Sequence, residues 1–183
     1  MVTPLTATPL WLSSYLLNKR DGGDELASRT MADKACGISP KGFARLALKG
    51  MVLSVPLAGG ASILKKRDCR PVLSDHGKWR KEHLGAFSAV YGRTPYYEHL
   101  IPEIEEVYAA SQEMELETFN SRLLDVALRW LDADEPPLLI DEKSPLLQEI
   151  ASKINPDISI FDALFRLGKI TRLGLHLKCR IQH

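Results

Sequence analysis

Apolar and aromatic side chains recur at three- and four-residue steps through the middle of the chain. Between residues 78 and 92 the recurring positions are Trp79, His83, Ala86, Phe87 and Val90. On a helix these positions share one face, so the pattern predicts a helix here. Ser74 or Asp75 is placed to cap its start, and Gly92 fits the left-handed position just past its end.

Helical spacing continues beyond this stretch. Thr94 and Pro95 predict the cap and the first turn of a second helix, so that residues 78–97 form a tight helix-turn-helix corner. Pro102 predicts a kink or a fresh start in this second helix, because proline has no N–H to donate. Residues 116–131 have the clearest amphipathic pattern of the chain.

Three shorter patterns follow towards the C-terminus. Ser144 followed by Pro145 predicts the start of a short helix, and Ser159 predicts the cap of another helix that ends at Gly168. Residues 173–181 alternate between apolar and polar side chains, which predicts an edge strand.

Two apolar runs before the corner have the pattern of strands. They cover residues 43–48 and 51–55 and are separated by Lys49 and Gly50. This is the length of a two-residue hairpin turn, and Gly50 supplies the positive φ that such a turn requires. Val72–Leu73 predicts a further short strand just before the corner.

Together these patterns predict an α/β or α+β fold with a small mixed sheet. The sheet contains a β-hairpin near residues 43–55, and helices form the majority of the C-terminal two thirds. Residues 10–17 add one short predicted helix near the front. No internal repeat and no low-complexity linker interrupts the chain, so residues 1–183 are predicted to form a single domain.

Composition narrows the classes of partner. The 183 residues include 24 Lys and Arg against 23 Asp and Glu. A net charge this close to zero argues against a protein that binds nucleic acid or anionic lipid through its overall electrostatic field. The sequence has no run of about 18 apolar residues, so no membrane insertion is predicted. A secretory signal has positive charges before its apolar run, and here none precedes the first apolar run. Cys36, Cys69 and Cys179 lie far apart, which is typical of a reduced, cytoplasmic chain.

His83 is the first candidate for catalysis. An imidazole titrates near neutral pH and can take a proton from an attacking amine or hydroxyl, and the predicted helix places it beside Trp79. The alternative is a histidine half-buried on a helix face, with its ring nitrogens satisfied by a backbone carbonyl or a tyrosine.

Several other side chains have both a binding and a packing interpretation. Tyr91, Tyr96 and Tyr97 would form a stacking and hydroxyl-donating wall for a sugar or base, or they pack in the core. Trp79 is a structural anchor first. Asn120 lies on the apolar face of its predicted helix and needs hydrogen-bond partners there, from neighbouring helices or from a ligand.

Basic side chains are candidates for binding a phosphate or pyrophosphate. Arg45 would bind as a fork, and Lys65 and Lys66 as point charges, whereas the alternative is that the lysines are solvated charges in a glycine-rich loop. No cofactor motif is present, since Gly59–Gly60 lacks the spacing of a phosphate-binding loop. No metal site is predicted, because the remaining histidines have no ligand spacing: His76, His99, His176 and His183.

The order and spacing of several short blocks resemble the WbqC-like family, named for proteins of bacterial O-antigen and other surface-polysaccharide gene clusters. The blocks cover about residues 43–168 and are Arg45, Leu53–Leu57, Lys78–His83, Ser88–Gly92, Pro95–Tyr97, Phe119–Asn120 and Asn155–Phe165. The front of the chain departs from the family pattern. The family opens on a strand leading into Gln-Pro-Tyr-Phe-Pro, whereas residues 8–12 here read Thr-Pro-Leu-Trp-Leu.

The resemblance implies a role in surface-polysaccharide biosynthesis, as a transferase that passes a glycyl or acyl group to an amino sugar. A nucleotide-activated or amino sugar is the implied partner. His83 would be the general base and Tyr91 with Tyr96 would shape the pocket, while Arg45 with Lys65 or Lys66 would hold an anionic substrate. The divergent front supports an alternative, a non-catalytic accessory or interaction protein that keeps the family scaffold.

Overall fold

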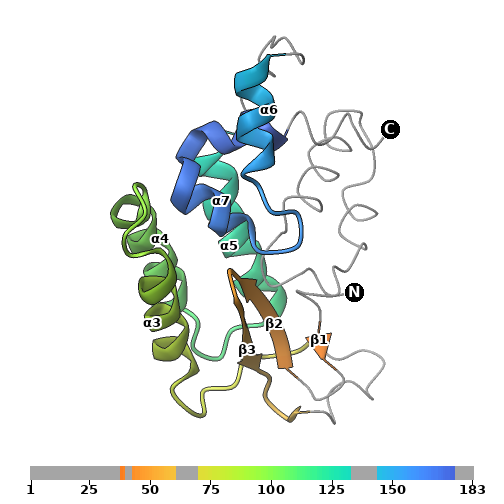
Figure 1. Cartoon of the computed structure of the whole chain (residues 1–183). Helices are drawn as coiled ribbons and strands as arrows, with labels where there is room; N and C mark the ends of the chain where they lie inside the picture. Colours follow the sequence, from red (N-terminus) through yellow and green to blue (C-terminus); the bar gives the residue numbers. More distant parts are fainter. Residues whose placement is uncertain (1–37, 40–42, 61–69, 133–143, 176–183) are drawn as a thin grey trace.

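Helices pack beside a small sheet and beyond its hairpin turn in the computed structural model, which describes residues 38–39, 43–60, 70–132 and 144–175 (Figure 1). The strands form one sheet in the order β1-β2-β3. Helices α3 and α4 lie side by side next to the hairpin, and α5 and α7 lie beyond its turn. The elements in chain order are β1 (Ile38–Ser39), β2 (Phe43–Leu48), β3 (Met51–Pro56), α3 (Trp79–Tyr91), α4 (Tyr97–Ala109), α5 (Leu116–Trp130), α6 (Pro145–Ser152), α7 (Ile160–Leu167) and the 3₁₀ helix η2 (Gly168–Ile170).

The predicted fold class is confirmed, with a small sheet, a hairpin and a helical majority in the C-terminal part. Both strand pairs among the described residues are antiparallel, so the mixed sheet of the prediction narrows to an antiparallel one. The reason is local, because a two-residue turn returns the chain directly alongside the strand it has just left.

The hairpin turn forms at the predicted residues. Leu48 pairs with Met51, and Gly50 has a φ of 78° while Lys49 is not among the positive-φ residues. Positive φ at the second central residue alone is the pattern of a type II turn, which explains why a lysine is tolerated at the first. Counting pairs from the turn, Pro56 falls at a position whose N–H would point away from β2, so the proline costs the ladder no hydrogen bond.

The chain beyond β3 extends the sheet by isolated bridges. Leu57 pairs with Leu73, and Val72 pairs with Glu115, both antiparallel. The strand predicted at residues 72–73 is therefore reduced to two single bridges, which fasten the segment before α3 between the end of β3 and the start of α5.

Aromatic side chains from α3 and α7 form the centre of the core. The rings of Tyr91 and Phe165 are stacked with their centroids 4.8 Å apart, and Phe87 packs at 5.8 Å from Phe165. Each of these side chains is buried. Burial of large aromatic side chains is a strong source of core stability, so this cluster fixes α3 against α7.

The start of α3 differs from the prediction. Lys78 is its N-cap residue, without a side-chain cap. Ser74 and Asp75 do not cap the helix because other groups use their oxygens: Ser74 Oγ accepts from the His76 amide, and Asp75 pairs with Arg80. Tertiary partners have replaced the local caps that the sequence favours.

The corner after α3 also differs. Gly92 is right-handed, with a φ of −56°, because its amide still bonds to Ser88 O at 2.9 Å in a helical manner. The turn is made instead by Thr94, whose hydroxyl donates to Tyr91 O at 2.6 Å and is therefore not the predicted cap of α4. Helix α4 begins at Tyr97 and continues through Pro102 as one helix.

The C-terminal helices are confirmed at their starts. Ser144 and Pro145 begin α6, and Ser159 Oγ accepts from the Phe161 amide at 3.3 Å at the start of α7. The strand predicted for residues 173–181 is wrong for residues 173–175, which belong to a helical segment at residues 171–175. Thr171 and Leu175 are both buried, and positions four apart share a helix face. Residues 176–183 and the helix predicted for residues 10–17 lie outside the described residues.

Two glycines should respond in opposite directions to alanine. Gly168 has a φ of 58°, and a Cβ there would lie 2.7 Å from Cε1 of Tyr96, so Gly168→Ala should lower the free energy of unfolding by about 3 kcal/mol. Gly85 lies inside α3 with nothing within 4 Å of its Cβ position, so Gly85→Ala should raise it by about 1 kcal/mol. Urea unfolding measures both, and an equal effect of the two changes would contradict the described packing.

Candidate functional site

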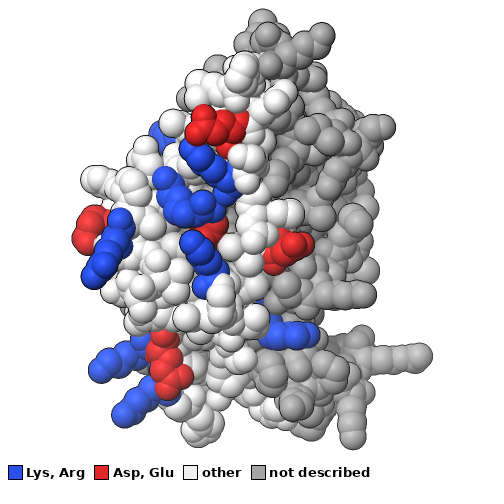
Figure 2. All heavy atoms as spheres, in the orientation of Figure 1, with Lys and Arg blue, Asp and Glu red and all other residues white. Residues whose placement is uncertain are grey.

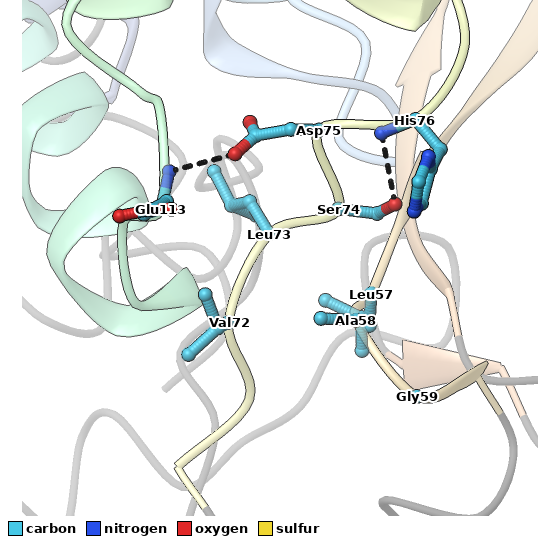
Figure 3. A pocket seen from close by; sticks show the side chains of 9 residues that line it. All are labelled: Leu57, Ala58, Gly59, Val72, Leu73, Ser74, Asp75, His76 and Glu113. Carbon is cyan, nitrogen blue, oxygen red and sulfur yellow. Dashed lines mark hydrogen bonds between the residues drawn. The ribbon is translucent and has the colours of Figure 1, made fainter.

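A cavity of about 550 Å³ opens beside the segment that leads from β3 to α3 (Figure 3). Pockets for small molecules are typically about 300–1,000 Å³ and mostly apolar, with a few polar groups. Its described lining fits this: the apolar part is Leu57, Ala58, Gly59, Val72 and Leu73, and the polar part is Ser74, Asp75, His76 and Glu113.

Backbone hydrogen bonds hold the walls of this cavity. The Ala58 amide donates to Val72 O, and the Ser74 amide donates to Pro56 O, both at 2.9 Å. The Leu73 amide donates to Met114 O, also at 2.9 Å. The walls are therefore joined to β3 on one side and to the turn before α5 on the other.

Asp75 connects the two sides of the cavity rim. Its Oδ1 accepts from Arg80 Nη2 at 2.6 Å, and its Oδ2 accepts from the Glu113 amide at 3.3 Å. Arg80 also donates to Ser111 Oγ at 2.7 Å, and its guanidinium lies 4.5 Å from the ring centroid of Trp79. The rim residues are thus held by α3 and by the α4–α5 turn together.

His76 is the imidazole that reaches this cavity. Its amide donates to Ser74 Oγ at 3.2 Å, which fixes the backbone, and its side chain is exposed. Figure 3 shows His76 and Asp75 on the same connecting segment, with Leu57 and Ala58 on the opposite wall. The site therefore combines an accessible base, carboxylates, a hydroxyl and an apolar floor.

Trp79 and His83 lie behind the wall, one helical turn apart on α3. The indole Nε1 of Trp79 donates to Ser74 O at 2.8 Å. His83 Nε2 lies 3.2 Å from Ser54 O, and Nδ1 lies 3.0 Å from the Tyr108 hydroxyl. A carbonyl oxygen only accepts, so Nε2 carries the proton and Nδ1 accepts from Tyr108.

The environment of His83 keeps it neutral. Burial lowers the pKa of His83 to about 4, although the hydrogen bond to Ser54 O opposes this shift. Burial likewise raises the pKa of Tyr108 well above its ordinary value. His83 is 2% exposed, and its ring nitrogens are hydrogen-bonded to a carbonyl and a tyrosine, as in the packing alternative, although the side chain is buried and not half-buried.

Comparison with known proteins identifies the family of this chain. The family model of the WbqC-like protein family matches residues 45–147, more than half of the chain. The chain belongs to the WbqC-like protein family. No curated protein and no solved structure gives a significant match.

The matched segment of this WbqC-like protein contains most of the hairpin, the described residues that line the cavity, and α3 to α5. The Trp79 and His83 pair of the family pattern binds two carbonyl groups, Ser74 O in the segment before α3 and Ser54 O in β3. The described residues contain no group of three or more metal-ligating side chains, and no helix among them is long and apolar enough to cross a bilayer.

The other predicted site residues are dispersed among the described elements. Tyr91 is buried with its hydroxyl accepting from the Lys49 amide at 3.2 Å, and burial raises its pKa. Tyr96 is half-buried against Gly168, and Asn120 is buried in α5. None of the predicted site residues that the structure describes lines the cavity.

Of the three residues predicted to bind an anion, the structure describes Arg45 only. Arg45 is half-buried on β2, opposite Ser54 in the register, with its Nε enclosed and without a hydrogen-bond partner. Lys65 and Lys66 lie outside the described residues. Figure 2 shows Lys and Arg side chains gathered above α7 and the hairpin turn, with acidic groups among them. That nucleic acid is not a partner stays a prediction.

The sequence contains a signal for the cavity at the residues predicted to cap α3. Residues 74–77 read Ser-Asp-His-Gly between a strand and a helix, a cluster of polar and turn-forming side chains. Glu113 had no sequence signal, because only the fold brings the α4–α5 turn to Asp75.

The pKa of His83 predicts an acid-sensitive component of stability. The folded pKa of about 4 lies below the ordinary 6.5, so between these values the unfolded chain binds more protons and the free energy of unfolding falls as the pH is lowered. The difference corresponds to about 3 kcal/mol, lost below pH 4 and fully present above pH 6.5. Urea unfolding from pH 4 to 7 should therefore show a smaller pH dependence for His83→Gln.

His99→Gln is the matched control, because His99 is exposed on α4. It should keep the pH dependence of the unaltered protein. Identical pH profiles for His83→Gln and the unaltered protein would show that His83 is not the buried neutral group described here.

Proposed function

We propose that this WbqC-like protein acts in the cytoplasm in the biosynthesis of bacterial surface polysaccharide of the O-antigen type. It transfers a glycyl or acyl group to the amine of an amino sugar bound in the cavity beside α3. The observation that supports this most is the exposed imidazole of His76 on the rim of a cavity of small-molecule size that Glu113 also lines.

His76 is the general base of the proposed reaction. The neutral amine nitrogen of the sugar attacks the carbonyl carbon of an activated donor, an acyl ester or thioester, and His76 takes the proton that this nitrogen loses as the new bond forms. The new bond is N–C, the bond from the carbonyl carbon to the leaving oxygen or sulfur breaks, and the leaving group takes the proton back from His76.

This proposal places the base at His76 instead of His83. A general base must reach the proton it removes, and His83 is 2% exposed with Nδ1 and Nε2 both hydrogen-bonded. His83 and Trp79 then position the cavity wall. Contacts of Arg45, Lys65 and Lys66 with an anionic part of the substrate stay a prediction.

A second candidate function is a non-catalytic accessory or interaction protein on the family scaffold. The enclosure of Trp79, His83 and Tyr91 favours it, because these residues of the family pattern serve packing and hydrogen bonding. Under this alternative the cavity would bind no amino sugar, or would bind one without turnover.

His76→Ala tests the proposal. The protein would be incubated with nucleotide-linked amino sugars and with glycyl or acyl esters and thioesters, and the acylated sugar would be measured by mass spectrometry. Loss of a general base should lower the rate by about 100-fold or more.

His99→Ala provides the matched control, since it removes an exposed imidazole outside the described lining and should leave the rate unchanged. Undiminished transfer by His76→Ala would remove its assignment as the base. Absence of product with every donor and acceptor would favour the accessory protein.

A further inference from the structure

Glu113 has a backbone conformation that its side chain does not favour. Glu113 and Asp132 are the non-glycine residues with positive φ in the described part of the chain, at 49° and 48°. Asp tolerates this region better than Glu, and the Asp132 carboxylate pairs with Lys169 at 3.0 Å. Glu113 has neither advantage.

The strain belongs to the turn between α4 and α5. The Met114 amide bonds back to Ser111 O at 3.4 Å, which makes Glu113 the third residue of a four-residue turn. With positive φ there, the turn is of the type that normally has Gly or Asn at this position. Asp75 Oδ2 holds the Glu113 amide, as the dashed line in Figure 3 shows.

The described residues that line the cavity carry more negative than positive charge. Asp75 is paired with Arg80 at 2.6 Å, so its charge is compensated. The Glu113 carboxylate has no ion-pair partner among the described residues, and none of the described lining residues is Lys or Arg. Among the described residues, the carboxylate of Glu113 is therefore a negative lining charge without an ion-pair partner, which favours a cationic ligand.

We infer that Glu113 is a ligand-contacting residue that binds the protonated amine of the acceptor through its carboxylate. The choice of an amino sugar rests on the proposed function, whereas the preference for a cationic amine rests on the cavity itself. Glu113 comes from the α4–α5 turn and His76 from the segment before α3, and both line the cavity (Figure 3). The bound ammonium group releases one proton to solvent before its neutral nitrogen attacks the donor. Leu57, Val72 and Leu73 offer an apolar surface to the sugar ring.

Two substitutions of Glu113 separate charge from strain. Glu113→Gln keeps the side-chain length and the strained backbone but removes the charge. Glu113→Asn removes the charge and relieves the strain, since Asn tolerates positive φ. Without ligand, Glu113→Asn should melt about 2–4 °C higher than the unaltered protein, and Glu113→Gln should not. Gln112→Asn is the control, because Gln112 precedes Glu113 in the turn and is not a positive-φ residue.

Ligand binding is tested by measuring the melting temperature with glucosamine as the cationic probe and with N-acetylglucosamine as the neutral control. Glucosamine should raise the melting temperature of the unaltered protein and of Gln112→Asn, because a ligand of the folded state stabilises it. Both Glu113 variants should lose that shift. Equal shifts for the two sugars, no shift for glucosamine, or a shift retained in Glu113→Gln would overturn the inference.

These outcomes are distinct from failure of the proposed function. A glucosamine shift that depends on Glu113, together with no acyl transfer from any donor, would support the amine site and contradict the transferase. Acyl transfer without a glucosamine shift that depends on Glu113 would support the transferase and contradict the amine site.

Discussion

The free edge of β3 is the constraint on which the described structure depends. Among the described strands β3 pairs only with β2, so alternate backbone groups on its other side need partners from elsewhere. His83 supplies a donor to Ser54 O, and the Ser74 amide supplies one to Pro56 O. Trp79 then donates to the carbonyl of Ser74 itself. One face of α3 thus binds the free edge of β3 through His83 and the segment at Ser74 through Trp79.

The cavity is a consequence of the same arrangement. Once Ser74 is fastened to both β3 and α3, the following residue, Asp75, is placed between Arg80 of α3 and the amide of Glu113. His76, one residue further on, has no such enclosure and is exposed at the rim. The buried side chains of Trp79 and His83 therefore position the cavity without lining it. For this reason the residues of the family pattern and those of the candidate site differ.

Local chemistry accounts for what the sequence predicted correctly. The hairpin follows from Gly50 and two apolar runs, and α7 follows from Ser159 and Gly168. Nonlocal contacts account for the rest. The helical period of α3 was visible, but whether a histidine on it was accessible or enclosed depends on β3 and on Tyr108 of α4, which periodicity does not place. The exposure of His76, likewise, is set by segments far away in the chain.

The most direct test of this account is amide hydrogen exchange in Trp79→Phe, which removes the donor to Ser74 O while keeping an aromatic ring in the core. The account predicts that the Leu73 and Ser74 amides exchange about tenfold faster relative to the amides of α5. Trp130→Phe is the control, because it removes the indole bond to Glu103 at 2.7 Å, outside the cavity. Unchanged protection of Leu73 and Ser74 in Trp79→Phe, or the same acceleration in both variants, would contradict the claim that α3 holds the cavity wall.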